Sequence, residues 1–203
     1  MITPVVPLNA LDGIAYVISR NGTIGAIGAA HWNKFARENG APELHDKRVI
    51  GRNLFDFVSG TDIRSLMREI LSGLADRRRA ACVFPMRCDA PSLVRNLRQS
   101  ITPIFKGNEC RSFLIQSVEL GSRQRPPIDL YDFRARLRED LGLPLIIMCS
   151  WCLRIQGSGS DADRWLTPER YYAAGGRSQV RISHGICEAC VLSAFPDVAI
   201  ANG

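Results

Sequence analysis

The stretch from Ile14 to Ile27 reads IAYVISRNGTIGAI and places an Asn-Gly pair between two apolar runs. Asn21 and Gly22 both tolerate the positive φ that a tight turn requires, and this pattern is the strongest short-range signal for a β-hairpin. The sequence therefore predicts two paired antiparallel strands at the start of a domain.

Helical spacing follows this hairpin. A short helix is predicted over His31–Asn39, where Gly40 provides a stop, and a longer one over Asp62–Ala75. In the longer segment, apolar residues recur every three or four positions and form one stripe, which is typical of a helix packed on a core. They are Ile63, Leu66, Met67, Ile70, Leu71 and Leu74.

Three further strands are predicted after the helices. The apolar period changes to two at Cys82–Cys88, and strand patterns continue over Leu93–Phe105 and Arg111–Glu119, with turn residues between them. Two strands, then helices, then three strands is an α+β order. We therefore predict a five-stranded antiparallel sheet with helices on one face.

The rest of the chain predicts a smaller module. A boundary is expected at 121–127, which reads GSRQRPP, because neither a sheet nor a helix interior accepts this mixture. A connecting helix is predicted over Leu130–Leu141. The expected organisation is an N-terminal segment, a sheet domain, a linker with its helix, a cysteine-rich module and a tail. Their ranges are 1–11, 12–120, 121–144, 145–195 and 196–203.

Two C-x-x-C pairs lie in that module, Cys149 with Cys152 and Cys187 with Cys190, and 34 residues separate the pairs. Two such turns brought together supply four thiolates for a tetrahedral zinc ion, and thiolate softness disfavours magnesium and calcium. His184 could replace one sulfur as a ligand or support the site from outside the coordination shell. The spacing predicts a structural zinc site, with a helix beginning at Thr167–Pro168 between the pairs.

Other interpretations of the cysteines remain open. A C-x-x-C pair can be a catalytic dithiol, but that use leaves the second pair idle. The four could also be buried small residues. Cys82, Cys88 and Cys110 are interpreted as core or incidental thiols. The chain shows no export signal, so disulfides are not expected.

The first module resembles a PAS domain of bacterial sensors. The resemblance rests on Asp12–Ile14, Val49–Val58 and the element order, and Phe84–Pro91 resembles a stretch found in some bacterial PAS-like proteins with a later cysteine motif. It implies a pocket that holds haem, flavin, a small metabolite or nothing, and the sequence does not choose among them. His31 and His45 could ligate haem, but such histidines are more often surface or core residues. The cysteine motif of flavin photoreceptors is absent.

The cysteine module resembles a small tail attached to bacterial PAS proteins, response regulators and related signalling chains. CSWC at 149–152 and SHGICEAC at 183–190 carry this resemblance. It implies a signalling context. Leu153 stands where a basic residue is usual, and the insert GSGS at 157–160 departs from the pattern.

Composition and motifs favour a non-catalytic protein. No phosphate loop, nucleophile elbow or metalloprotease motif occurs, and a four-thiolate zinc leaves no position for substrate. The net charge of +6 and the cluster Arg77–Arg79 favour a solvated basic face over a nucleic-acid surface. No apolar run is long enough for a membrane span.

We therefore expect a cytoplasmic sensory or signal-transduction protein that binds a ligand or partner and carries a zinc module. Its partner would be another signalling protein or a second copy of the chain. The alternatives are a thiol redox switch that acts by zinc release and a nucleic-acid-binding regulator.

Overall fold

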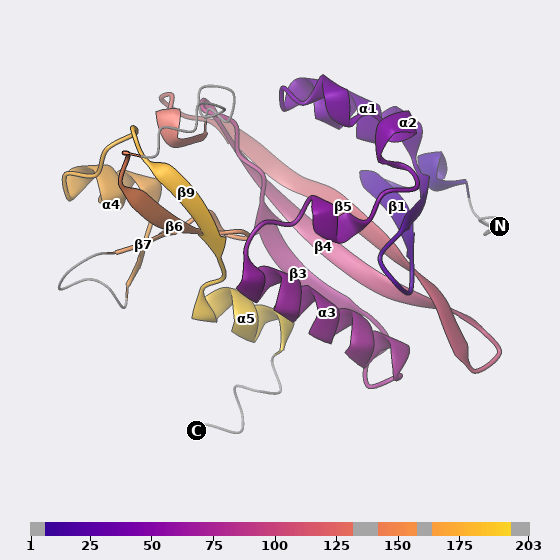
Figure 1. The fold of residues 1–203 in the computed structure, drawn as a ribbon. Helices are drawn as coiled ribbons and strands as arrows, with labels where there is room; N and C mark the ends of the chain where they lie inside the picture. Colours follow the sequence, from indigo (N-terminus) through magenta and orange to yellow (C-terminus); the bar gives the residue numbers. More distant parts are fainter. Residues whose placement is uncertain (1–6, 132–141, 158–163, 196–203) are drawn as a thin grey trace. The chain divides into compact units, whose positions relative to one another are not determined.

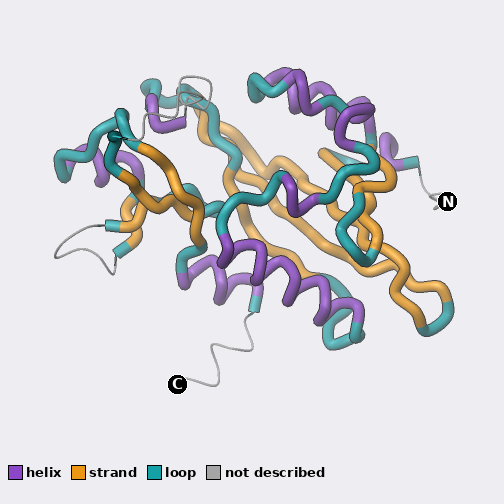
Figure 2. The backbone as a smooth tube through the Cα atoms, in the orientation of Figure 1, coloured by secondary structure: helices purple, strands orange, loops and turns teal. Residues whose placement is uncertain are grey.

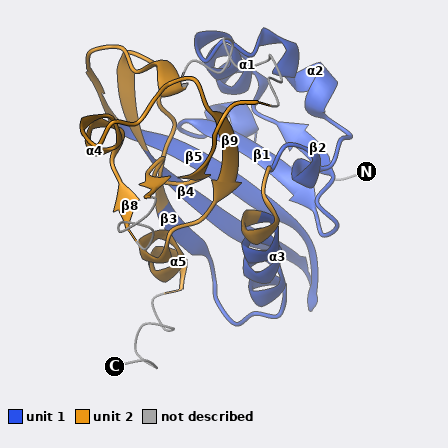
Figure 3. Ribbon diagram, turned by 60° about the vertical axis from the view of Figure 1, so that its left-hand side comes forward, with its two compact units in different colours: residues 1–58, 64–84, 97–120 blue, residues 59–63, 85–96, 121–203 orange. Residues whose placement is uncertain are grey.

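A computed structural model describes residues 7–131, 142–157 and 164–195. The chain forms two compact units, shown in two colours in Figure 3. Unit 1 comprises residues 1–58, 64–84 and 97–120, and unit 2 comprises residues 59–63, 85–96 and 121–203. Unit 2 is thus assembled from three separate stretches of the sequence.

The five predicted strands form one antiparallel sheet in the order β2-β1-β5-β4-β3. The strands are β1 (Ile14–Ser19), β2 (Ile24–Ile27), β3 (Cys82–Arg87), β4 (Leu93–Lys106) and β5 (Glu109–Gln124). Tyr16 on β1 lies opposite Ile27 and Ile115, which fixes the register of the central strands. Gly22 has a φ of +90°, so the Asn-Gly turn forms as predicted. The predicted α+β fold is confirmed.

Helices occupy the segment between β2 and β3. They are α1 (Ala29–Glu38), η2 (Pro42–Leu44), α2 (Asp46–Val49), η3 (Leu54–Asp56) and α3 (Thr61–Ala75), and η1 (Leu8–Ala10) precedes β1. All six residues of the predicted apolar stripe on α3 are buried, and Figure 1 shows this helix running alongside the sheet. The longer helix is therefore confirmed, with its packing face.

The strands β4 and β5 are longer than predicted. Figure 2 shows them as an extended hairpin, and Gly107 with a φ of +61° sits in the turn. Strand β5 continues to Gln124, so residues 121–124 of the predicted linker belong to the sheet instead. These residues are exposed, and a strand end that buries neither face does not require apolar side chains.

Unit 2 contains a second sheet, in the order β8-β7-β6-β9. Its elements are η4 (Asp129–Tyr131), β6 (Leu145–Cys149), β7 (Ile155–Gln156), β8 (Trp165–Leu166), α4 (Pro168–Ala173), β9 (Arg181–Gly185) and α5 (Glu188–Ala194). Strands β6 and β9 are parallel, while β6–β7 and β7–β8 are antiparallel. Thr167 caps α4 and Pro168 occupies its first turn, as predicted.

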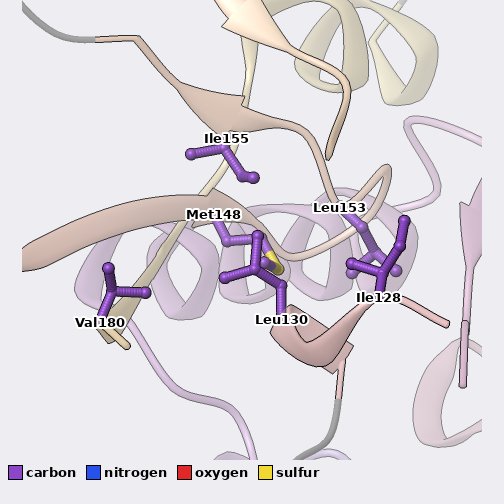
Figure 4. Packing of buried hydrophobic residues seen from close by; sticks show 6 residues of the cluster. All are labelled: Ile128, Leu130, Met148, Leu153, Ile155 and Val180. Atoms are coloured by element: carbon purple, nitrogen blue, oxygen red, sulfur yellow. The ribbon is translucent and has the colours of Figure 1, made fainter. Parts of the chain in front are cut away.

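Six buried side chains form the apolar core of unit 2. They are Ile128, Leu130, Met148, Leu153, Ile155 and Val180, and Figure 4 shows them gathered from separate segments of the chain. The predicted connecting helix over Leu130–Leu141 lies almost entirely outside the described residues. No helix within the described ranges is both long enough and apolar enough to cross a membrane.

Candidate metal centre

The first cysteine pair lies where β6 turns into β7. Cys149 ends β6, and its backbone N–H donates to the carbonyl oxygen of Arg154 at 2.8 Å. Leu153 donates its N–H to the carbonyl oxygen of Cys149 at 3.0 Å and adopts a left-handed φ of +59°. This conformation is costly for a branched side chain, but Leu153 is buried in the core of unit 2. Packing of Leu153 therefore helps to hold the turn that carries Cys152.

The second pair lies at the start of α5. Cys187 is the N-cap residue of this helix, and the N–H of Cys190 donates to the carbonyl oxygen of Cys187 at 3.0 Å. The parallel pairing of β6 with β9 places Gly185 opposite Cys149, and Ser150 donates its N–H to Gly185 at 2.9 Å. Two residues after Gly185, Cys187 therefore arrives beside the first pair.

The four sulfur atoms lie within 4.8 Å of one another. Cys149, Cys187 and Cys190 are buried, and Cys152 is half-buried. The sulfurs of Cys152 and Cys187 are 3.6 Å apart, and the Cys187 N–H donates to the Cys149 sulfur at 3.4 Å. A tetrahedral ion with zinc–sulfur bonds of about 2.3 Å requires sulfurs about 3.8 Å apart. The spacing, the donor type and the N–H···S contact all fit such an ion.

The four thiols cannot all ionise readily as an isolated group. Hydrogen bonds from the thiols of Cys152 and Cys190 lower the pKa of Cys149 to about 2. Donation to the Cys149 thiolate raises the pKa of Cys152 to about 12, and the pKa of Cys190 is raised for the same reason. One negative charge shared among neighbouring thiols thus opposes further ionisation. A divalent cation at the centre supplies the positive charge that four thiolates require.

His184 lies on β9, where it is half-buried and opposite Met148. In the described ranges, the cluster of close ligand atoms consists of the four cysteine sulfurs and does not include His184. His31 is exposed on α1, and His45 precedes α2 with its Nδ1 3.8 Å from Asp46 Oδ1. Neither histidine belongs to this group.

The other three cysteines lie outside the cluster. Cys82 and Cys110 are buried, Cys88 is half-buried, and burial raises the pKa of each thiol. All seven cysteines lie in the described ranges, and none of them forms a disulfide. The burial of Cys82 and Cys110 fits their interpretation as core residues.

A close backbone contact joins the loop before α3 to the strand that leads to the second cysteine pair. A Cβ built on Gly60, whose φ is +91°, would lie 2.2 Å from the carbonyl oxygen of His184. Both residues belong to unit 2. Gly60 is therefore required by its conformation and by its contact with β9.

Replacement of Gly60 with alanine is predicted to destabilise unit 2 by about 2–4 kcal/mol, because backbone strain and the collision with β9 add together. Gly51→Ala is the matched control, since Gly51 has a similar φ of +87° but no atom within 4 Å of an added Cβ. Chemical denaturation measures the loss of unfolding free energy in each variant, and the difference between the two losses reports the collision with β9. Equal losses in the two variants would contradict this contact.

A buried ion cluster in unit 2 was missed by the sequence reasoning. Asp89, fully buried at the β3–β4 turn, accepts hydrogen bonds from Arg87 and from Arg125 Nη1, the latter at 2.8 Å. It also accepts the backbone N–H of Arg95 at 3.2 Å. The Arg125 side chain is only 4% exposed. One buried carboxylate therefore pairs with two guanidinium groups, of which that of Arg125 is also buried.

Arg125 also binds the backbone of the same turn. Its Nε donates to the carbonyl oxygen of Pro91 at 3.1 Å, and its Nη2 donates to that of Ala90 at 2.9 Å. On the neighbouring strand, the N–H of Arg87 donates to the carbonyl oxygen of Trp151 at 2.6 Å. These contacts fasten the β3–β4 turn to the segment that carries the first cysteine pair. The signal in the sequence was Arg-Cys-Asp-Ala-Pro at 87–91, but its partner at position 125 is not predictable from spacing.

No protein-family model and no curated protein matches this chain. Solved structures similar to it include the PAS domain of BvgS from Bordetella pertussis, with 13% identity, a TM-score of 0.43, and coverage of 56% of this chain and 81% of that one. A PAS domain from Desulfitobacterium hafniense has 11% identity, a TM-score of 0.38 and coverage of 56% and 97%. The PAS domain of an HTR-like protein from Haloarcula marismortui has 17% identity and a TM-score of 0.36, and the match covers 56% of this chain and 85% of that one. These similarities are low, and the fold class rests on the strand order and register of this chain.

Proposed function

We propose that this chain is a non-catalytic signalling protein in which a sensory sheet unit is joined to a unit folded around a structural zinc ion. The convergence of four cysteine sulfurs within 4.8 Å carries the proposal. The cluster is largely buried, its ligands are soft, and it joins two segments that are 34 residues apart in the sequence. These are the properties of a structural zinc site.

The same cluster supports a non-catalytic role. A zinc ion held by four thiolates has a closed coordination shell, so neither water nor a substrate can reach it as a ligand. Metal binding joins the β6–β7 turn to the start of α5, and such binding is coupled to the folding of small modules. We therefore propose that the metal stabilises the folded structure of unit 2, and that unit 2 presents a surface to a partner.

The signalling context rests on the sequence resemblance of the cysteine module and of the first module to parts of bacterial sensory proteins. The five-stranded antiparallel sheet is compatible with that assignment. Four thiolate ligands for zinc require reduced cysteines, which a reducing compartment maintains, and we propose the cytoplasm. The proposed partner is another signalling protein or a second copy of this chain.

Elemental analysis of the full chain, purified under reducing conditions without a metal-binding tag, tests this proposal. We expect one zinc per chain and no visible absorbance from haem or flavin. Replacement of the zinc with cobalt should give the intense absorption of a tetrahedral thiolate site. Protein that is folded, reduced and free of metal would contradict the structural role.

A thiol redox switch is a second candidate, favoured by the 3.6 Å between the sulfurs of Cys152 and Cys187 and by the partial exposure of Cys152. Hydrogen peroxide oxidises one thiolate to a sulfenic acid as its oxygen–oxygen bond breaks and hydroxide leaves. The second thiolate then displaces hydroxide and forms the disulfide. In total, the two thiolates lose two electrons to the peroxide. The two hydroxide ions take up two protons to give two waters, and zinc is released because two of its ligands are lost.

Peroxide titration separates the two roles. For a switch, we expect one zinc to be released for every two thiols lost, at peroxide concentrations below those that oxidise Cys82 or Cys110, and full reloading after reduction. The Cys152→Ser variant should show no disulfide to Cys187. Zinc retention until the core thiols react would leave the structural role alone.

Binding of nucleic acid finds less support in the arginine cluster. Arg77 donates to the carbonyl oxygen of Gly107 at 3.0 Å and lies 4.0 Å from the centre of the Phe105 ring. Arg78 lies 3.7 Å from Asp76. Arg77 and Arg78 thus have partners within the chain.

A further inference from the structure

A cleft of about 680 Å3 opens in unit 1 between the β1–β2 turn, the segment around η3 and one side of α3. Its volume lies within the range of about 300–1,000 Å3 that small-molecule sites occupy. The cleft is separate from the cysteine cluster, because none of its lining residues is a cysteine and all belong to unit 1.

The lining of the cleft is strongly basic. Arg20, Arg64 and Arg68 contribute three positive charges, and Asp56 is the single acidic residue among the lining residues. Asp56 lies 3.9 Å from Arg52, so its charge is already matched outside the arginine trio. The three guanidinium groups therefore give the cleft an excess of positive charge.

The arginines have donors left for a ligand. Arg64 uses its Nε to donate to the carbonyl oxygen of Val58 at 2.6 Å, which orients the group and leaves its two terminal nitrogens. The guanidinium of Arg68 lies 4.7 Å from the centre of the Phe55 ring. Arg20 and Arg68 have no ion pair within the described part of the chain. Planar guanidinium groups of this kind bind carboxylate and phosphate through paired hydrogen bonds.

One wall of the cleft is held rigidly. Asn53 Oδ1 accepts the N–H of Phe55 at 3.0 Å, and Asn53 Nδ2 donates to the carbonyl oxygen of Asn21 at 2.9 Å. These bonds fix Phe55 against the β1–β2 turn. Leu71 and Phe113, both buried, add apolar surface to the lining. A ligand here meets charge and apolar surface together, on a pre-organised wall.

We propose that this cleft binds a small organic anion whose carboxylate or phosphate group pairs with Arg20, Arg64 and Arg68 and whose apolar part packs against Phe55 and Leu71. The inference goes beyond the metal centre, and its meaning as a sensed signal rests on the proposed sensory function. The binding itself does not depend on zinc.

Calorimetric titration of the full zinc-loaded chain tests this assignment with phenyl phosphate and phthalate as probes, inorganic phosphate as the charge without the ring, and benzyl alcohol as the ring without the charge. We expect saturable one-to-one binding of at least one aromatic anion, weaker binding of phosphate, and none of benzyl alcohol. The stronger of the two aromatic anions identifies the acidic group. Arg20→Gln and Arg68→Gln should each weaken binding about tenfold, since each removes a charge-assisted hydrogen bond.

Arg37→Gln is the matched control, because it removes the same charge from an exposed position on α1 outside the cleft. It should leave the affinity unchanged. An equal loss of affinity in this control would overturn the proposal, as would the absence of anion binding. The proposal would also fail if a short single-stranded oligonucleotide bound more tightly than the aromatic anions and its binding were unaffected by Arg68→Gln. Zinc content measured on the same samples keeps the two hypotheses apart, because loss of anion binding with zinc retained refutes only the cleft.

Discussion

Replacing Cys187 with alanine should reduce bound zinc from one per chain to near zero and unfold most of unit 2. Cys187 is buried, caps α5 and lies 3.6 Å from the sulfur of Cys152, so its loss removes one ligand and breaks the link between α5 and the β6–β7 turn. Structural zinc contributes about 10–16 kcal/mol in small zinc-finger peptides, more than the whole stability of many domains. Zinc analysis and hydrogen exchange of the β6 and β9 amides measure both effects.

Cys110→Ala is the matched control for this experiment. Cys110 is also buried, but it lies in unit 1, where its sulfur donates to the carbonyl oxygen of Ser112 at 3.6 Å. We expect a loss of only about 1 kcal/mol and full zinc content. The β1 and β5 amides should stay protected in both variants. Stoichiometric zinc and intact protection of β6 in Cys187→Ala would refute the metal assignment.

The second large effect is expected at Asp89. The Asp89→Asn variant should lose about 3–5 kcal/mol of unfolding free energy, because it removes the fully buried charge that pairs with the guanidinium groups of Arg125 and Arg87. Arg125 keeps its hydrogen bonds to the carbonyl oxygens of Pro91 and Ala90, so the loss reports the carboxylate and not the whole turn. Denaturation followed by the fluorescence of Trp151, which is buried in unit 2, measures the effect.

Asp76→Asn provides the comparison. Asp76 also lies near an arginine, 3.7 Å from Arg78, but its side chain is 55% exposed, and a pair of this kind contributes less than about 1 kcal/mol. The double variant Asp89→Asn with Arg125→Gln should lose less than the sum of the two single changes, because the charges are coupled. Similar losses at Asp89 and Asp76 would show that the buried cluster does not stabilise the fold.

Local patterns were sufficient to predict the five strands of the first sheet and the helices α1 and α3. The Asn-Gly turn and the stripe on α3 depend on neighbours only a few residues apart, and both are found where the sequence placed them. The end of β5 was missed because Gly121–Gln124 lack apolar residues, and an exposed strand end leaves no periodic signal. Hydrophobic periodicity reports burial, and it cannot detect a strand that buries neither face.

The site was predictable to a similar extent. The C-x-x-C spacing predicted that the four cysteines would converge, and the structure brings their sulfurs together. Whether they bind zinc stays a prediction. The parallel pairing of β6 with β9 that delivers Cys187, the approach of Gly60 to His184, and the pairing of Asp89 with Arg125 are contacts across long sequence separations. These contacts form only when the chain folds, so no short sequence motif predicts them.

The discontinuity of unit 2 has a consequence for how such a module can be inherited. Its contacts require residues 59–63 and the β3–β4 turn at 85–96 as well as residues after 120. A gene fusion that transplants only the last 83 residues would leave behind Asp89, the counter-charge of Arg125, and Gly60, the neighbour of His184. We therefore expect residues 121–203 of this chain to be less stable in a new host unless that host supplies segments that replace residues 59–63 and 85–96.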